Sequence, residues 1–173
     1  MNHIAFQSAI GWITVSASSE GICRVDYYGD NPPSPDSIKN NLRKHFPSFE
    51  LDPEACRKLL ADTKTAILEY FSKQTPLPAI PLDMRSGTAF QKKVWQSLCR
   101  IPFGETRSYL DIARITGKPK AARAVGQACG KNPIALVVPC HRVISEGGKL
   151  GGYSGGLNIK KALLKLENIK FAT

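Results

Sequence analysis

Long apolar runs are absent from this chain of 173 residues. No stretch approaches the roughly 20 consecutive apolar residues that a membrane-spanning helix requires. The N-terminus, MNHIAFQSAIGWITV, has no basic segment followed by an apolar stretch and a small-residue cleavage site, so we expect no secretory signal. Hydrophobic residues at 42% and charged residues at 22% exclude disordered and fibrous proteins. We therefore expect an intracellular protein without a membrane partner, cytoplasmic in a prokaryote or nuclear in a eukaryote.

Paired cysteines are absent as well. The five cysteines, at positions 23, 56, 99, 129 and 140, are odd in number and form no CxxC pair. This pattern disfavours a disulfide framework and a zinc site of the CxxC type. A lone cysteine in an intracellular protein is most often a small buried hydrophobe. Only Cys140 has neighbours that indicate chemistry.

Acidic residues are scarce in the second half of the chain. Residues 1–84 hold 8 Lys and Arg against 10 Asp and Glu, a net charge of −2, whereas residues 85–173 hold 16 against 4, a net charge of +12; the two add to the +10 of the whole chain. This asymmetry predicts a polyanion-binding surface on the C-terminal part, with nucleic acid the commonest partner. On charge alone, a basic surface without a ligand is the alternative.

The first half alternates in the manner of strands and then becomes helical. Apolar alternation over residues 4–6, 12–15 and 22–27 predicts a small antiparallel sheet. Apolar residues at helical spacing from Ile38 to Phe46, and again over 59–71, predict two helices that cover this sheet.

A proline-rich segment separates the two halves. Residues 75–83, TPLPAIPLD, hold three prolines, which predicts irregular structure and a linker. We therefore expect an α/β protein of the α+β type, with an N-terminal domain over 1–80 and a C-terminal domain over 85–173. Thr88 is expected to cap the first helix of the second domain, and residues 157–168 to form its last, amphipathic helix.

A helix-turn-helix is predicted between these two helices. Thr106 or Ser108 can cap a short helix that carries Tyr109, and after a glycine turn a second helix runs over 119–129. Short helical hairpins are also common as plain packing units. The second helix is rich in alanine and glycine, which allows close approach to another surface, and Arg123 is its long side chain.

The chemical site is predicted at the end of an apolar run. IALVV, residues 134–138, is suited to a buried strand that delivers Cys140, His141 and Arg142 at its end. A free thiol with a pKa of about 8.5 is only a few per cent thiolate at neutral pH, so a nucleophilic cysteine needs a base or a positive field nearby. His141 is the obvious base, and Arg142 adds positive charge. Because adjacent strand residues point to opposite faces, His141 reaches Cys140 only if the backbone turns, or through a bridging water.

A histidine that acts as a base usually needs a carboxylate to fix its tautomer. The acidic residues beyond Arg85 are Glu105, Asp111, Glu146 and Glu167. We expect Glu167, on the last helix, to be the partner of His141. A solvated glutamate on a helix face is the alternative.

Four segments of the second half resemble one family in their order and spacing. They are GTAFQKKVWQSLCRIPFGETRSYLDIA, GKPKAARAVGQACGKNP, VVPCHRVI and GGYSGGLNIKKALLKLE, and together they span about residues 87–167. With them the chain resembles the O6-alkylguanine-DNA alkyltransferases, also called methylated-DNA-protein-cysteine methyltransferases. The first eighty residues match only in outline. The implied fold is a small sheet-and-helix domain of ribonuclease-H-like topology, then a mainly helical domain with a helix-turn-helix and a buried active-site cysteine.

The resemblance implies catalytic roles for five residues. Cys140 would accept the alkyl group, His141 would be its base acting through a water, and Glu167 would orient His141. Asn132 would brace the active-site turn. The hydroxyl of Tyr109 would donate to N3 of the extruded guanine.

The resemblance also implies a DNA-binding face and a base pocket. Arg123 would enter the duplex and fill the gap left by the flipped nucleotide, with its helix in the minor groove. The other DNA-binding residues implied are Tyr109, Ser108, Ala122, Gly126, Lys118, Lys120 and Lys131. The residues implied for the base pocket are Val143, Tyr153, Ser154 and Gly155.

The implied activity is DNA repair by direct reversal of damage. The thiolate of Cys140 would take the alkyl group from O6-alkylguanine, and from O4-alkylthymine, in double-stranded DNA. A thioether is a poor leaving group, so the protein would be consumed once, as a monomer and without a cofactor. Some relatives hold zinc in the N-terminal domain, but Cys23, Cys56, His3 and His45 do not reproduce that pattern, so no metal is expected. Ala135 stands where some relatives have a second proline, which leaves the range of alkyl groups open.

Three other functions compete with this one. An alkyltransferase-like protein binds the lesion but lacks the acceptor thiol, whereas Cys140 is present here. A cysteine hydrolase using Cys140 and His141 would turn over, but it would not explain the basic half. A transcription regulator would need a sequence-specific DNA site rather than a lesion.

Overall fold

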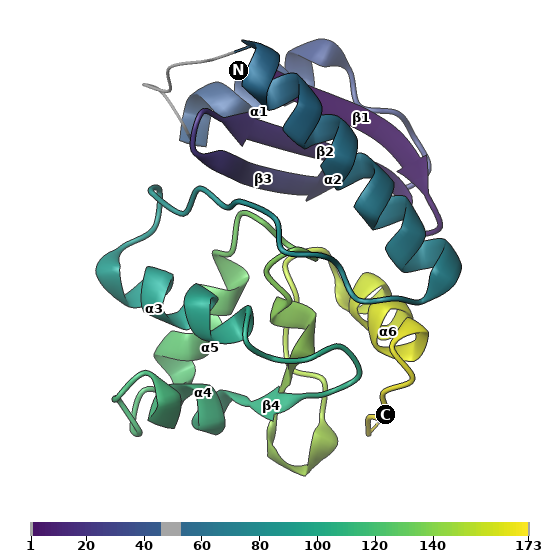
Figure 1. Cartoon of the computed structure of the whole chain (residues 1–173). Helices are drawn as coiled ribbons and strands as arrows, with labels where there is room; N and C mark the ends of the chain where they lie inside the picture. The colour runs from purple at the N-terminus through teal and green to yellow at the C-terminus, as the bar shows by residue number, and fades with distance from the viewer. Residues whose placement is uncertain (1, 46–52, 173) are drawn as a thin grey trace. The chain divides into compact units, whose positions relative to one another are not determined.

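The computed structural model of this chain describes residues 2–45 and 53–172, and its packing forms two compact units, Met1–Ser86 and Gly87–Thr173 (Figure 1). Phe46, expected in a helix, lies outside the described residues. That the units are domains with the limits 1–80 and 85–173 stays a prediction. Within the described ranges, no helix combines the length and apolarity needed to cross a membrane.

The first unit contains the expected antiparallel sheet. Strands β1 (Asn2–Ser8), β2 (Gly11–Ser18) and β3 (Gly21–Tyr27) pair in chain order. The turn between β1 and β2 requires glycine, because Gly11 has a φ of +99° and a Cβ there would lie 2.4 Å from the carbonyl oxygen of Gly29. The alternating pattern of the sequence therefore predicted these three strands correctly.

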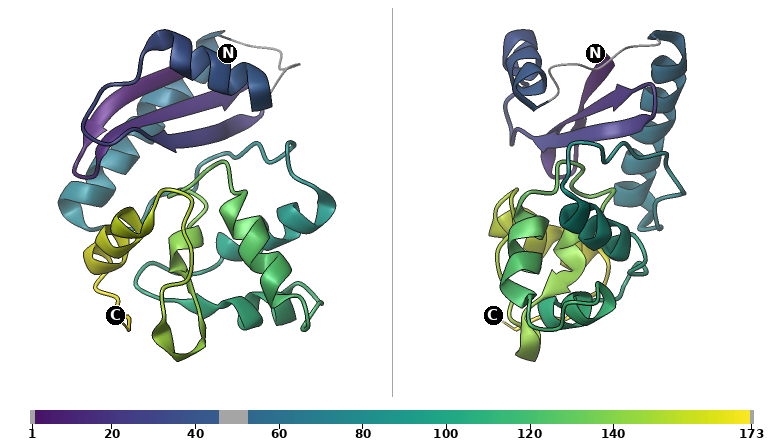
Figure 2. Two further views of the ribbon diagram at one scale, coloured as in Figure 1. Left: turned by 180° about the vertical axis from the view of Figure 1, so that it is seen from behind. Right: turned by 90° about the vertical axis from the view of Figure 1, so that its left-hand side faces the viewer.

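Two helices, α1 (Pro35–His45) and α2 (Pro53–Lys73), cover opposite faces of this sheet (Figure 2). Neighbouring residues of β1 show the division, since successive strand side chains point to opposite faces. Ala5 packs with Ile38 and Leu42 of α1, whereas the ring of Phe6 lies 5.9 Å from Nζ of Lys64 on α2.

The proline-rich segment 75–83 is irregular, as expected, but it is not a free linker at its end. The amide of Ile22 donates to the carbonyl of Pro81 at 2.8 Å, and the amide of Asp83 donates to the carbonyl of Ile22 at 2.8 Å. The buried carboxylate of Asp83 also accepts from Oγ of Ser18 at 2.6 Å. These bonds attach the segment to the free edge of β3.

The second unit is mainly helical, as expected. Its elements, in chain order, are α3 (Ala89–Leu98), β4 (Arg107–Ser108), α4 (Tyr109–Ile115), α5 (Ala122–Gly130), the 3-10 turn η1 (Cys140–Arg142), β5 (Val143–Ile144), the 3-10 turn η2 (Glu146–Gly148) and α6 (Leu157–Leu166). Thr88 caps α3 in a capping box with Gln91. The buried Trp95 of α3 donates from Nε1 to the carbonyl of Ala128 at 2.8 Å, which joins α3 to α5.

Helices α4 and α5 form the predicted helical hairpin. Of the two caps considered, Ser108 is the one used, in a capping box with Asp111. The predicted start of the second helix at residue 119 is wrong by three residues. The amide of Ala121 donates to the carbonyl of Lys118 at 2.9 Å, so a turn precedes the helix, and Arg123 is its second residue.

The buried strand expected over residues 134–138 is also wrong. Leu136 has a φ of +75°, the amide of Val138 donates to the carbonyl of Ile134 at 2.9 Å, and Ala135 and Val138 form only an isolated bridge. The run is nevertheless core, since Ile134, Leu136 and Val138 are at most 1% exposed. Burial, rather than strand pairing, therefore explains its apolar composition.

Candidate functional site

A short parallel strand pair brings the predicted residues of the second unit together. Strand β5 follows η1 directly, and its Val143 pairs with Arg107 of β4. Strand β4 leads directly into α4, whose first residue is Tyr109. Cys140 and Tyr109 are therefore each close in sequence to the same short pair of strands, β4 and β5. Both residues line one cavity.

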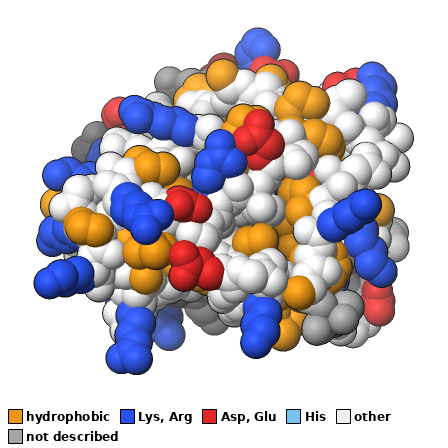
Figure 3. Space-filling model, turned by 90° about the horizontal axis from the view of Figure 1, so that it is seen from below, with side chains coloured by type: hydrophobic (Ala, Val, Ile, Leu, Met, Phe, Trp, Pro, Cys, Tyr) orange, Lys and Arg blue, Asp and Glu red, His pale blue; other side chains and the backbone are white. Residues whose placement is uncertain are grey.

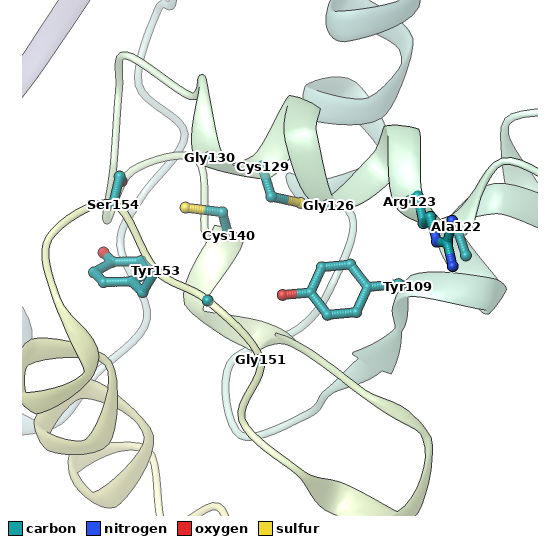
Figure 4. A pocket seen from close by; sticks show the side chains of 11 residues that line it. Tyr109, Ala122, Arg123, Gly126, Cys129, Gly130, Cys140, Gly151, Tyr153 and Ser154 are labelled. Carbon is teal, nitrogen blue, oxygen red and sulfur yellow. The ribbon is translucent and has the colours of Figure 1, made fainter.

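The cavity has a volume of about 570 Å³. It is lined by Tyr109, Ala122, Arg123, Gly126, Cys129, Gly130, Cys140, Gly151, Gly152, Tyr153 and Ser154 (Figure 4). Figure 4 shows the hydroxyl of Tyr109 directed toward Gly151 and the sulfur of Cys140 directed toward Ser154. Seven residues predicted from the sequence thus share one concave site, with a thiol in its wall.

Cys140 is 3% exposed and is held by Asn132. The amide Nδ2 of Asn132 donates to Sγ of Cys140 at 3.2 Å and to the carbonyl of Val138 at 2.8 Å, while its Oδ1 accepts from the amide of Ile134 at 3.0 Å. Burial raises the pKa of the Cys140 thiol to about 11, against the hydrogen bond from Asn132 and the charge of Lys160, which lower it. The free thiol therefore needs proton removal to become a nucleophile.

His141, the residue that follows Cys140 in the chain, is fully buried. The backbone turns after Pro139 into η1, so the alternation of a strand does not apply here. Nε2 of His141 lies 2.9 Å from Oε1 of Glu167, and Nδ1 is buried without a hydrogen-bond partner in the described part of the chain. Burial lowers the pKa of His141, against the opposing effect of Glu167. A neutral imidazole that donates from Nε2 to a carboxylate leaves the Nδ1 lone pair free to accept a proton.

Glu167 is 2% exposed at the C-terminal cap of α6, so the solvated alternative does not hold. Besides His141 it accepts from the amide of Gly104 at 3.2 Å and from Arg142, whose Nε and Nη2 each lie 2.9 Å from a carboxylate oxygen. Arg142 also donates from Nη1 to the carbonyl of Ile101 at 2.8 Å. The positive charge expected from Arg142 is thus paired with the carboxylate of Glu167.

Lys160 is a cation of this site that the sequence analysis missed. It is 0% exposed on α6, and its Nζ donates to the carbonyls of Val143, at 2.7 Å, Leu150 and Gly152, at 3.3 Å. The helical spacing could have indicated that Lys160 is buried. Lys160 precedes the buried Leu163 and Leu164 by three and four residues, so it lies on the apolar face of α6.

Tyr109 lies against the glycine wall of the cavity, which is formed by Gly151 and Gly152. Burial raises the pKa of its hydroxyl to about 12, with Cys129 and Cys140 adding to the rise and a hydrogen bond with the Gly152 backbone opposing it. A Cβ at Gly151 would lie 2.7 Å from this hydroxyl, and Gly151 has a φ of +64°. The tyrosine therefore stays protonated at neutral pH and is able to donate a hydrogen bond into the cavity.

The predicted DNA-binding residues divide between the cavity and the surface. Arg123, Ala122 and Gly126 line the cavity from α5, and Arg123 is exposed. The lysines at positions 118, 120 and 131 are exposed, and Nζ of Lys118 lies 5.2 Å from the ring centre of Phe90. Figure 3 shows Lys and Arg side chains around the edge of the face seen from below, with hydrophobic side chains between them.

Other predicted residues lie outside the cavity lining. The hydroxyl of Ser108 caps α4, Val143 is buried and presents its carbonyl to Lys160, and Gly155 is not among the lining residues. Conversely, Cys129, Gly130, Gly151 and Gly152 line the cavity without having been predicted. Small residues give no chemical signal of their own in a sequence. Among the residues that the structure describes, no group of three or more His, Cys, Asp or Glu side chains is placed to hold a metal ion.

Comparison with known proteins agrees with this site. Residues 89–169 match the family described as 6-O-methylguanine DNA methyltransferase, DNA binding domain. A methylated-DNA–protein-cysteine methyltransferase of Methanosarcina barkeri is 40% identical over 96% of this chain and 97% of its own length. The structure of Mycobacterium tuberculosis OGT in complex with DNA covers 96% of this chain and 92% of its own, with 40% identity and a TM-score of 0.77. The O6-methylguanine-DNA methyltransferase of Pyrococcus kodakaraensis covers 96% of this chain and 98% of its own, with 28% identity and a TM-score of 0.67. The likeness extends over both units: the sheet with its two helices, and the helical second unit with its cysteine pocket. The chain therefore belongs to the methylated-DNA–protein-cysteine methyltransferase family.

Proposed function

We propose that this chain repairs DNA by transferring the alkyl group of O6-alkylguanine to Sγ of its own Cys140. It is a methylated-DNA–protein-cysteine methyltransferase, and alkyl transfer to cysteine is the activity of its family. The observation that supports Cys140 as the acceptor is its position: its thiol lines the cavity, and the next residue in the chain, His141, pairs with Glu167. Of the five cysteines, Cys140 is the one that a histidine, His141, follows directly in the chain.

The reaction is a displacement at carbon. Nδ1 of His141 takes the thiol proton through a water, while Glu167 stabilises the imidazolium that forms. The thiolate attacks the carbon attached to O6, an S–C bond forms, and the C–O bond breaks with its electron pair leaving on guanine. Tyr109 donates its hydroxyl hydrogen bond to N3 of the departing base, which makes the base a better leaving group. The thiol proton ends on guanine, and Cys140 becomes a thioether. Because a thioether is a poor leaving group, the protein reacts once.

The partner is double-stranded DNA containing the lesion. The similar Mycobacterium tuberculosis protein has been seen in complex with DNA. In this chain the target base must leave the stack to reach Cys140, because that thiol is 3% exposed inside a cavity. Arg123, exposed at the start of α5, is placed to fill the gap in the duplex, with α5 in the minor groove. The same pocket would accept O4-alkylthymine as a second substrate.

One observation and one chemical argument disfavour two of the three competing functions. The acceptor thiol is present, which a non-reacting lesion-binding protein lacks. A cysteine hydrolase would need to release its intermediate, and a thioether, unlike a thioester, has no carbonyl for water to attack.

Intact-protein mass spectrometry after incubation with O6-methylguanine duplex tests the proposal. We expect one added methyl group per protein, on the peptide that contains Cys140, and never more than one equivalent of product. Cys140→Ser should abolish transfer and keep binding to DNA. Multiple turnover, or a methyl group on another cysteine, would refute the proposal.

A further inference from the structure

A tight turn shortly after α3 directs a main-chain donor at the carboxylate of Glu167. The turn comprises residues 102–105, and the amide of Glu105 donates to the carbonyl of Pro102 at 3.2 Å. Its third residue, Gly104, has a φ of +80°. A positive φ at this position is that of a type II turn, which requires glycine or asparagine there. In this conformation the amide of Gly104 donates to Oε2 of Glu167 at 3.2 Å.

Arg142, the ion-pair partner of Glu167, is held by the same part of the chain. Its Nη1 donates to the carbonyl of Ile101 at 2.8 Å, and its guanidinium carbon lies 5.8 Å from the ring centre of Phe103. The face of an aromatic ring attracts a guanidinium. Residues 101–104 therefore contact both members of the buried ion pair.

The segment then continues to the other side of the cavity. After the turn comes β4, which pairs with β5, and β5 begins directly after Arg142. Tyr109 follows β4 without an intervening residue. One stretch of chain, residues 101–109, thus links the donor to Glu167 with the tyrosine that lines the cavity.

Four donors surround the carboxylate of Glu167. Oε1 lies 2.9 Å from Nε2 of His141 and 2.9 Å from Nη2 of Arg142, while Oε2 lies 2.9 Å from Nε of Arg142 and 3.2 Å from the amide of Gly104. A carboxylate has about four acceptor sites, so each of them is used. A proton added to Glu167 would face one of these donors. The thiol proton therefore stays on His141, and the carboxylate acts by orienting the imidazole ring.

We propose that the turn over residues 102–105 is a positioning element for alkyl transfer: the amide of Gly104 holds Glu167 in the orientation that keeps His141 protonated at Nε2. The inference rests on the proposed function and adds a main-chain group to its site. Every residue type except proline has this amide. The left-handed conformation at position 104, rather than the chemistry of a side chain, is therefore what the reaction requires.

The test compares Gly104→Val with Gly104→Asn. Asparagine adopts a positive φ and keeps the amide in place, whereas a β-branched residue rarely does, so valine moves the turn. Gly29→Val is the control, because Gly29 is a turn residue of the first unit with a φ of +61° and nothing within 4 Å of a built Cβ.

We expect the single-turnover rate of methyl transfer from O6-methylguanine duplex to fall about tenfold in Gly104→Val, since one hydrogen bond to a charged group is lost. Gly104→Asn and Gly29→Val should keep the wild-type rate. The Kd for undamaged duplex should be the same in all three variants, because the turn acts on the reaction and not on DNA binding. Equal rates in Gly104→Val and Gly104→Asn would overturn the proposal.

Nitrogen NMR of protein with isotope-labelled histidine measures the tautomer directly. The chain has three histidines, and His141→Gln identifies the signals of His141. We expect protonation at Nε2 alone in the wild type and in Gly104→Asn, and a mixture of tautomers in Gly104→Val. A wild type protonated at Nδ1, or equal signals in the two variants, would overturn the proposal. A wild type that has the expected tautomer and transfers no methyl group would refute the proposed function alone.

Should Gly104→Val not fold, Phe103→Leu tests the same turn. Leucine keeps an apolar side chain but removes the aromatic face beside Arg142. We expect the rate of transfer to fall about threefold, with the Kd for undamaged duplex unchanged. Phe71→Leu is the control, since Phe71 is a half-buried ring on α2 of the first unit. A wild-type rate and a wild-type tautomer in Phe103→Leu would overturn the role of the turn.

Discussion

Arg142 donates to both carboxylate oxygens of Glu167, with each N–O distance 2.9 Å, and both side chains are buried. Removing one partner of a buried ion pair leaves the other charge uncompensated, which costs about 3–5 kcal/mol. Glu167→Gln should therefore lower the free energy of unfolding by about that amount in urea denaturation. The exposed Glu146 provides the control, since Glu146→Gln should change stability by less than about 0.5 kcal/mol. Equal stability of the two variants would contradict a buried pair.

His141 predicts how stability depends on pH. Burial lowers its pKa below the ordinary value of 6.5. Below pH 6.5 the unfolded chain then binds more protons at this position than the folded chain, so the free energy of unfolding should fall as the pH drops through that region. Urea denaturation at pH 7.5 and at pH 5.5 measures the fall, and His141→Gln should reduce it. A variant with the wild-type pH dependence would show that another group is responsible.

Gly151 should tolerate no side chain. With a φ of +64° and the Tyr109 hydroxyl 2.7 Å from the position of a Cβ, Gly151→Ala strains the backbone and displaces the tyrosine. We expect a loss of about 1–3 kcal/mol in thermal denaturation and slower reaction with O6-alkylguanine. Gly130 lines the same cavity with nothing within 4 Å of a built Cβ, so Gly130→Ala should be no less stable than the wild type. If both alanine variants had wild-type stability, the close approach of Tyr109 to Gly151 would be wrong.

Arg123 should matter only when a base has to leave a duplex. Extrusion costs a few kcal/mol, and loss of the side chain that fills the gap should slow the reaction on duplex DNA about tenfold. Reaction with free O6-benzylguanine needs no extrusion, so Arg123→Ala should leave that rate nearly unchanged if the pocket admits the benzyl group. Single-turnover rates with both substrates are compared, and a parallel fall in the two rates would mean that Arg123 acts on the reaction inside the pocket and not on base extrusion.

Binding to undamaged duplex should weaken steeply with salt. The half with a net charge of +12 must release counterions from the DNA on binding, which gives a linear fall of log K with log salt. Fluorescence anisotropy between 50 and 200 mM salt, about the range over which such an effect is large, measures the slope. Replacing Lys118, Lys120 or Lys131 with alanine should lower its magnitude by about one unit or less each, whatever the DNA sequence. A flat response would separate the charge asymmetry from DNA binding.

Local signals explain what the sequence predicted well. Thr88 and Ser108 each cap a helix through a residue three positions later, so the signal and the structure lie within one turn. The three strands of the first unit follow from alternation in the same way. Glu167 could be predicted as the partner of His141 because only four acidic residues follow Arg85, which leaves few candidates.

Contacts between distant segments explain what it missed. Residues 134–138 satisfy the composition of a strand, but they pair with no strand of the described ranges 2–45 and 53–172, and Leu136 turns the chain back instead. Lys160 was missed because its acceptors are main-chain carbonyls, which every residue has. The cavity wall at Gly151 and Gly152 depends on the approach of Tyr109 from α4, some forty residues earlier in the chain.

The exposure of the cysteines has a consequence for a protein that reacts once. Cys99 is exposed, whereas Cys140 is 3% exposed and reached through the cavity. A small electrophile in solution therefore encounters Cys99 before it encounters Cys140. Alkylation of Cys99 would consume no repair capacity, whereas a group that alkylates Cys140 has to enter the cavity first.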